Sequence, residues 1–403
     1  MKYLLISIVV FLFIYSCEKE DQNNPEPINL EEFKSELLNS EVEFSLDLFL
    51  KIQSEFPDSN LCLSPYSAYV CLAMAANGAN GSNLLEFLNV LGLSRNNIDA
   101  VNQVVVGLRD SLLNADPMTK FTSVNSLWYN NNWQVYGDYQ SDLREYYDAK
   151  VSGLDFGNSS SVDTINDWVS YHTNDKIKEL VDDISPSDIC FLINAVYFNG
   201  QWTQVFNRDN TWIKVFYLPN GEYTECNLMD VTGVFNVFYD DKLIAAELPY
   251  GNKAFAMYVF MPRKSTQTLA DFFEESLLGQ WPVIRDKFLP DTTRIKLPQF
   301  SIENDYELKT YLNNMGLIEA FKSSADFSKM GLGPLWFSKV RQKTFIDVNE
   351  DGTEAAAATA MTGVTGMPPP YSFNRPFIYL IADKATGTII FIGQVTDPKQ
   401  NQI

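Results

Sequence analysis

The sequence predicts an α+β fold, because helical and strand-like patterns both recur along the chain. An apolar stripe of roughly helical spacing runs through residues 30–56, and the alanine-rich residues 68–77 favour a buried helix. Residues 124–129 alternate like a strand, and residues 190–198 form a nearly continuous apolar run, typical of a strand buried on both faces. A further helix is predicted from residue 164 to about Leu180.

The composition allows a large core and argues against a polyanionic partner. Of the 403 residues, 46% are hydrophobic and 14% aromatic, and no low-complexity linker divides the chain. The chain has 30 Lys and Arg against 51 Asp and Glu, which gives a net charge of −21. Such a chain is repelled by nucleic acid, by heparin-like polyanions and by anionic membrane surfaces. We therefore expect no nucleic-acid partner and no heparin site.

The N-terminal residues predict a targeting signal. An apolar run over residues 3–15, too short to span a membrane as a mature helix, ends at Cys17. Residues 14–17 resemble a bacterial lipoprotein cleavage box, and the acidic residues 18–21 are similar to a lipoprotein surface-export signal. The resemblance implies an outer-membrane lipoprotein exposed at the cell surface and held by lipid on Cys17, with a periplasm-facing or secreted protein as alternatives. The implied parts are a signal peptide (1–16) and a lipidated cysteine with a polar tether (17–29).

Residues 353–367 are the most unusual stretch of the chain. They contain no proline, no aromatic residue and one charge, Glu354, and small side chains dominate. Read with period two, one face carries only small or apolar residues from Thr353 to Gly363, so this face could be buried in a sheet. Alanine and glycine are poor strand formers, however, so the stretch is also typical of an exposed linker.

The same region partly resembles a calcium-binding loop. Asp347, Asn349, Asp351 and Gly352 match the opening of an EF-hand loop, but the twelfth position, which needs a bidentate glutamate, is Ala358. The residues that lead into Asp347 also alternate like a strand instead of forming a helix. We therefore expect no calcium site and no other metal.

The motif from Glu350 to Ala358, followed by Phe373-Asn-Arg-Pro-Phe377, resembles the hinge and reactive-centre loop of the serpins. Further segments match this family in the same order, from residue 30 to Pro398. The resemblance implies one serpin domain over residues 30–400, with three β-sheets, about eight or nine helices and an exposed reactive-centre loop at about 350–373.

The resemblance also assigns residues to the opening of the main sheet, sheet A. Ser64 and Ser67 would lie beneath the opening, although two serines beside a proline are also typical of helix capping. Asn194 would be the polar residue under the sheet, and Trp202 the aromatic residue near its top. Gln342 stands where serpins commonly carry histidine, so its amide could make the same hydrogen bonds without titrating.

The serpin resemblance implies a suicide-substrate inhibitor that needs no cofactor. A target protease cleaves the loop and is acylated, and the freed segment then inserts into sheet A and distorts the trapped protease. The hinge must therefore be small and uncharged where insertion begins. The hinge residues are Glu350, Gly352, Thr353, Ala355, Ala356, Ala357 and Ala358. From Gly352 onward they are small and uncharged, and the one charge among them, Glu354, would point outward.

The cleaved bond follows from the spacing to the hinge. Counting from Glu350 places it between Gly366 and Met367, whereas Thr365 or Val364 are the alternatives for the residue before the cut. No charge lies between Glu354 and Arg375, so trypsin-like and caspase-like targets are disfavoured. An elastase-like, subtilisin-like or broad cysteine-protease target fits better.

No enzymatic chemistry is indicated. The only histidine, His172, lies on the polar side of a predicted helix, and no nucleophile motif or phosphate loop occurs. Cys62, Cys71, Cys190 and Cys226 have no metal-binding spacing, and their disulfide state is open.

Two rival functions remain, a non-inhibitory serpin-fold binding protein on the cell surface and a surface lipoprotein that captures glycans or nutrients.

Overall fold

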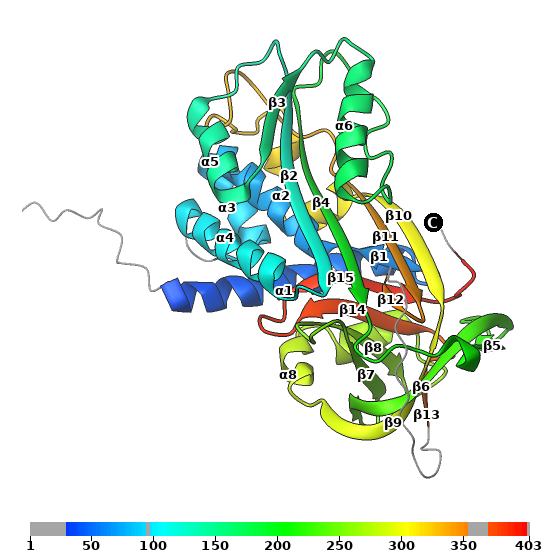
Figure 1. The fold of residues 1–403 in the computed structure, drawn as a ribbon. Coiled ribbons are helices and arrows are strands. Elements are labelled where there is room, and N and C mark those ends of the chain that lie inside the picture. Colours follow the sequence, from blue (N-terminus) through cyan, green and yellow to red (C-terminus); the bar gives the residue numbers. More distant parts are fainter. Residues whose placement is uncertain (1–29, 94–96, 354–369, 401–403) are drawn as a thin grey trace, which may run out of the picture.

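The computed structural model describes residues 30–93, 97–353 and 370–400. The predicted signal peptide, Cys17 and the tether lie outside these residues. So do the predicted cleaved bond and the hinge residues after Thr353. The described residues contain nine α-helices and fifteen strands, which confirms the α+β class (Figure 1).

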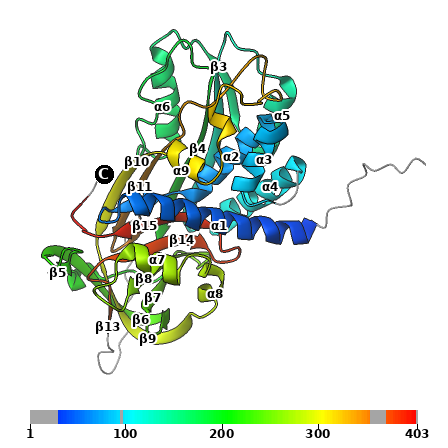
Figure 2. The ribbon, with the colours of Figure 1, turned by 180° about the vertical axis from the view of Figure 1, so that it is seen from behind.

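The first two helices agree with the sequence patterns. Helix α1 (Leu30–Glu55) covers the predicted residues 30–56, and Figure 2 shows it running across the back of the molecule. Helix α2 (Pro65–Gly78) is buried almost throughout, because its alanines let it approach its neighbours closely. The remaining helices are α3 (Gly81–Val90), α4 (Ile98–Asn114), α5 (Gly137–Tyr147), α6 (Ser160–His172), α7 (Leu269–Ser276), α8 (Trp281–Arg285) and α9 (Lys309–Asn314).

Helix α6 is shorter than the sequence predicted. It ends at His172, and the prediction that it continues to Leu180 is wrong. The cause is local, since Asn174 and Asp175 adopt left-handed φ values of 53° and 60°. Asparagine and aspartate tolerate this conformation better than other side chains, and it cannot be part of a right-handed helix. The chain therefore leaves α6 and returns toward the next strand without regular structure.

The first sheet has six strands in the order β10-β11-β12-β4-β2-β3 (Figure 1). Helix α2 packs against one face of β4 within the main core. Helix α6 covers the other face, over a small separate cluster of Trp128, Ile165, Val169, Val181, Ile193 and Ala195. The strands are β2 (Thr119–Asn130), β3 (Lys150–Leu154), β4 (Cys190–Gln201), β10 (Phe300–Glu307), β11 (Arg341–Asn349) and β12 (Gly352–Thr353).

The other strands form one nine-stranded sheet, so the described strands make two hydrogen-bonded sheets instead of the three implied by the resemblance. The reason is β6, which spans 17 residues and pairs with β5, β9 and β7, so that it joins the second and third sheets. These strands are β1 (Leu61–Leu63), β5 (Trp212–Tyr217), β6 (Tyr223–Tyr239), β7 (Leu243–Pro249), β8 (Phe255–Pro262), β9 (Leu289–Pro298), β13 (Pro370–Ser372), β14 (Phe377–Asp383) and β15 (Ile389–Val395).

Candidate functional site

The hinge already forms a short strand inside the six-stranded sheet. The two residues of β12 lie between β11 and β4, where Thr353 pairs with Val348 on one side and with Gly200 on the other. Strand β12 is antiparallel to both neighbours, so β4 and β11 are parallel to each other. We call the line between β4 and β11, along which β12 points, the seam.

Gly352 is required at the start of β12 for two reasons. Its φ of +149° lies in a region that residues with side chains rarely adopt. A Cβ atom at this position would lie 2.1 Å from the carbonyl oxygen of Gly200 and 2.8 Å from Cα of Gln201. Both contacts are with backbone, which cannot rotate away. The glycine of the hinge motif therefore allows the chain to approach β4 closely.

At the hinge end of the seam, Thr353 is held by an aromatic pair. Its hydroxyl forms a 2.7 Å hydrogen bond with the hydroxyl of Tyr250, and both groups are buried. Burial raises the pKa of Tyr250 well above its usual value. The Tyr250 ring stacks on Trp202 with 4.5 Å between centroids. The indole N–H of Trp202 donates to the backbone oxygen of Asn349 at 2.9 Å, so the pair fixes the end of β11 as well as β12.

Two buried carboxylates anchor the turn between β11 and β12. Glu350 accepts hydrogen bonds from the Thr211 hydroxyl at 2.6 Å and from the Gln299 amide at 2.7 Å. Asp351 is also buried and pairs with the exposed Arg208, whose pKa this hydrogen bond raises. Buried charges are stable only when they are paired or hydrogen-bonded in this way. The turn is therefore a fixed base from which the loop begins.

Next to Thr353, on the side away from the turn, the seam contains a small cavity of about 20 Å³. It is lined on one side by Val196, Tyr197 and Phe198 of β4 and on the other by Phe345, Ile346 and Asp347 of β11, with Thr353 and residues of the segment after α6. The cavity lies in the direction in which β12 would continue. The predicted hinge residues Ala355, Ala356, Ala357 and Ala358 lie outside the described residues.

Gln342 and Ser64 make a reciprocal contact on the β11 side of the seam. The Gln342 amide oxygen accepts from the backbone N–H of Ser64 at 3.1 Å, and its amide nitrogen donates to the Ser64 carbonyl at 2.8 Å. The Ser64 hydroxyl does not cap α2 but donates to the carbonyl of Ile390 at 2.9 Å. The buried glutamine thus ties β11 to the start of α2 through a group that carries no charge at any pH.

Asn194 and Ser67 make the corresponding contact on the β4 side. The Ser67 hydroxyl donates to the backbone oxygen of Asn194 at 3.2 Å. The Asn194 amide nitrogen donates to Ser123 at 3.1 Å and to Asn125 at 2.7 Å. Among the described residues, the amide oxygen of Asn194 is buried and has no hydrogen-bond partner. Asn194 therefore keeps one acceptor unused beside the seam.

The structure brings together four of the five predicted sheet-opening residues at α2, whereas Trp202 lies at the opposite end of the seam, beside the hinge. Three further residues of the site were not predicted from the sequence: Tyr250, Gln299 and Arg208, which bind Thr353, Glu350 and Asp351 respectively. Tyr250 ends the segment 247–250, which is one of those that match the serpin family in order, so its place in the chain was predictable. Its role as the partner of Thr353 was not, because the two residues are far apart in sequence.

The other candidate groups take no part in this site. His172 is half-buried against Trp168, with 4.7 Å between ring centroids, and burial lowers its pKa. The four described cysteines are free thiols, and burial raises the pKa of Cys62 to about 12. Across residues 30–93, 97–353 and 370–400, no cluster of three metal-ligating side chains occurs. None of the helices in these ranges is long and apolar enough to cross a membrane.

A family model described as "Serpin (serine protease inhibitor)" matches residues 39–398. The chain belongs to the serpin family. Serpins are generally inhibitors of serine proteases and typically not enzymes. The hinge motif and the fold are thus both those expected of a serpin.

Relatives in archaea and in animals match this serpin over most of its length. An uncharacterized serpin-like protein of Methanosarcina acetivorans is 32% identical, with 89% of this chain and 86% of the relative covered. Neuroserpin of Gallus gallus is 30% identical, with 89% and 91% covered. Among solved structures, the thermophilic serpin Tengpin in its native state matches with a TM-score of 0.80 at 28% identity, covering 93% of this chain and 96% of that one.

Proposed function

We propose that this protein is a suicide-substrate inhibitor of an endopeptidase, a serine protease with elastase-like or subtilisin-like preference. The observation that carries the proposal is β12, since the first hinge residues already pair with both strands between which the loop would insert. Non-inhibitory relatives would be expected to carry bulky, charged or proline residues at the hinge. Here Gly352 and Thr353 fit the sheet, and four alanines follow Glu354.

The proposed reaction begins as ordinary proteolysis. The serine Oγ of the protease attacks the carbonyl carbon of Gly366, an ester forms, and the peptide bond to Met367 breaks with its nitrogen leaving as a protonated amine. The freed segment from Glu354 to Gly366 then enters the seam with the protease still attached. Trapping succeeds only if insertion outruns hydrolysis of the ester.

The register of β12 supports this path. Thr353 pairs with Gly200 and Val348, so continuation in the same register would bring residue 359 opposite Asn194 and Gln342. Residue 359 is a threonine, and it would share the core-facing side of the strand with Thr353. Its hydroxyl could then donate to the unused amide oxygen of Asn194. The register thus places a threonine of the inserting segment opposite the unused buried acceptor of Asn194.

Insertion is also energetically reasonable. About a dozen new ladder hydrogen bonds at about 1 kcal/mol each give a gross gain on the order of 10 kcal/mol, from which the ordering of the loop subtracts. The uncleaved protein would then be a kinetic trap whose loop cannot reach its most stable position until it is cut. A cleaved and inserted form should accordingly melt at a higher temperature than the intact protein.

The target preference follows from the loop sequence. The proposed cleaved bond, Gly366–Met367, and its alternatives at Thr365 and Val364 present only small or medium uncharged side chains. Pockets that require lysine, arginine or aspartate would not accept them. The relevant proteases are therefore those with small apolar pockets.

The test is incubation with elastase and with subtilisin, followed by denaturing electrophoresis and mass spectrometry of the released C-terminal peptide. A denaturant-resistant complex and a peptide that begins at Met367, Gly366 or Thr365 are expected. Cleavage without a complex, together with an unchanged melting temperature of the nicked protein, would instead support the alternative of a non-inhibitory serpin-fold binding protein.

We also propose that the inhibitor is an outer-membrane lipoprotein exposed at the cell surface. The support is the sequence around Cys17, a short apolar run followed by acidic and polar residues. A Cys17→Ser variant should lose metabolic labelling with a fatty acid and appear in the soluble fraction. Digestion of intact cells by added protease distinguishes surface exposure from a periplasm-facing anchor, and release of unlipidated wild-type protein would indicate a secreted form.

A further inference from the structure

The segment that follows α6 lies over the seam. We call residues 173–183 the strap. Thr173 and Ile177 line the small cavity between β4 and β11. The amide nitrogen of Asn174 donates to the Tyr197 hydroxyl of β4 at 3.4 Å, and the Lys176 ammonium lies 4.8 Å from the centroid of the Phe345 ring of β11. The strap therefore touches both strands that would have to separate for the loop to enter.

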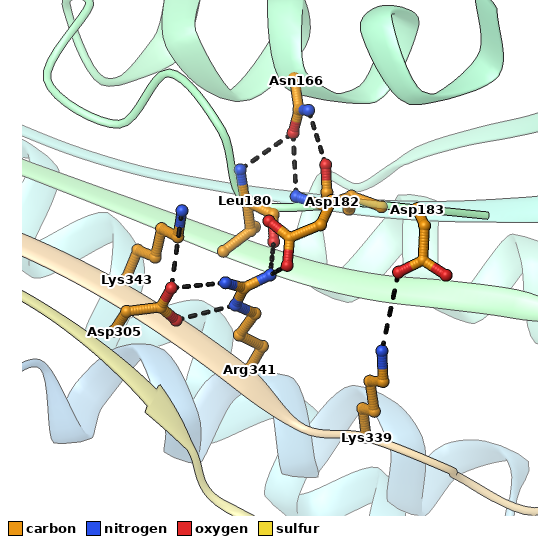
Figure 3. A network of polar contacts seen from close by, with 9 residues as sticks. Asn166, Leu180, Asp182, Asp183, Asp305, Lys339, Arg341 and Lys343 are labelled. Carbon is orange, nitrogen blue, oxygen red and sulfur yellow. Dashed lines mark hydrogen bonds and ion pairs between the residues drawn. The ribbon is translucent and has the colours of Figure 1, made fainter. Parts of the chain in front are cut away.

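The strap is firmly attached to α6. The amide nitrogen of Asn166 donates to the backbone oxygen of Val181 at 2.7 Å. Its amide oxygen accepts from the N–H groups of Leu180 and Val181, both at 2.9 Å (Figure 3). Val181 also packs in the small cluster between α6 and strands β2 and β4. The strap thus belongs to the half of the sheet that contains β4.

Arg341 is attached to the other half. It begins β11, and its guanidinium binds Asp305 of β10 through two hydrogen bonds of 2.7 and 2.5 Å. The Lys343 ammonium lies 3.5 Å from the same carboxylate. Strands β10 and β11 pair along their whole length, so this cluster moves with them as a unit.

Two ion pairs join the two halves, together with a long hydrogen bond of 3.5 Å from Nη1 of Arg341 to the Leu180 carbonyl. The Nη1 atom of Arg341, which Asp305 does not use, binds the carboxylate of Asp182 in the strap (Figure 3). The Arg341 side chain is 28% exposed and that of Asp182 is 55% exposed, so solvent weakens the attraction without removing it. The neighbouring pair, Lys339 with Asp183, is 3.8 Å long and largely exposed, at 69% and 79%. This exposed pair should contribute little to holding the two halves together.

We propose that the Arg341–Asp182 ion pair is a latch that slows opening of the seam, and that it thereby sets the fraction of cleaved molecules that trap the protease. This inference rests on the proposed inhibitory function. Widening the seam moves the strap away from β11, which breaks the pair with Asp182 but leaves the pair with Asp305 intact. An attraction present in the closed sheet and absent in the open one raises the barrier to insertion.

The decisive variant is Asp182→Asn, because it removes the latch and leaves Arg341 bound to Asp305. Its matched control is Asp183→Asn, which makes the same change one residue later in the exposed pair. From the usual strength of a partly exposed ion pair, insertion in Asp182→Asn should be about two- to fivefold faster. Fewer inhibitor molecules should then be consumed for each protease trapped, and Asp183→Asn should behave like wild type.

Ionic strength gives a second signature. Added salt screens an exposed pair, so insertion in the wild-type protein should accelerate between about 0.05 and 0.5 M salt. The Asp182→Asn variant should already be fast and should respond less. The salt response of the protease itself is measured on a small peptide substrate and divided out.

Amide hydrogen exchange of β4 and β11 in the intact protein tests the latch without any protease. Faster exchange in Asp182→Asn than in Asp183→Asn supports the latch, and equal exchange with equal trapping in both variants overturns it. If no protease forms a complex with the wild-type protein, the proposed function fails, and the exchange comparison alone then decides whether the latch exists. Circular dichroism of each variant confirms that it is folded.

Discussion

The substitution Gly352→Ala should convert the inhibitor into an ordinary substrate. The new Cβ would lie 2.1 Å from the carbonyl oxygen of Gly200, which belongs to a strand fixed on both sides. Alanine also disfavours the φ of +149° that the glycine adopts. The hinge residue can therefore no longer occupy its place between β11 and β4, either before or after cleavage.

The size of the effect can be worked out from these contacts. In the intact variant the hinge can leave the seam and avoid this strain, whereas insertion must place residue 352 between β4 and β11. A residue with a side chain in this region of φ costs about 2 kcal/mol, which slows insertion by roughly 30-fold. Hydrolysis of the acyl-enzyme does not depend on the hinge, so it would win in most encounters.

The assay is titration of a fixed amount of elastase or subtilisin with the variant, read as residual protease activity and as complex on a denaturing gel. Gly221→Ala is the control, because Gly221 also has a positive φ, +84°, but no atom within 4 Å of its Cβ position. The control should trap as wild type does. If Gly352→Ala traps with wild-type efficiency, a close approach of the hinge to β4 is not needed for insertion, and the reasoning fails.

Three further predictions concern buried polar groups. Burial raises the pKa of Glu41 to about 8 from 4.5, so the folded state favours the protonated acid and stability falls as pH rises from about 4.5 to 8; Glu41→Gln should raise the melting temperature at pH 8 and leave it unchanged at pH 4.5. Gln342→His should make the trapping rate increase below about pH 6, because a buried imidazolium weakens the contact with Ser64, whereas wild type should show no such change. Tyr250→Phe removes the partner of the Thr353 hydroxyl and should lower the melting temperature by roughly 2 °C, measured by calorimetry.

Several helices and strands could be predicted from the sequence, because these depend on local periodicity. The alternation of residues 340–348 predicts β11, and the apolar run of residues 190–198 predicts β4. The early end of α6 could not be predicted from hydrophobic spacing, since the apolar pattern continues past His172. The only local indication that α6 ends at His172 is the pair Asn174 and Asp175, two residue types that tolerate a left-handed backbone.

The contacts of the site depend on residues that are distant in sequence, and this limits what sequence reasoning can supply. Helix capping was a sound local interpretation of Ser64, but its hydroxyl bonds to Ile390 and its backbone to Gln342. The partner of Asp351 is Arg208, which carries no local sign of that role. The order of the sequence motifs shows on which strand such a residue lies. Its hydrogen-bond partner is known only when the packing of the strands is known.

The seam is held closed at its two ends by different kinds of interaction. Beside the hinge, the hydrogen bond between Thr353 and Tyr250 and the stack on Trp202 are buried and should be insensitive to salt. At the start of β11, Arg341 and Asp182 are partly exposed and should weaken as salt rises. The seven residue steps from Arg341 to Val348 place these ends about 23 Å apart, too far for direct coupling. Solution conditions should therefore alter how readily the sheet opens at its far end without loosening the hinge.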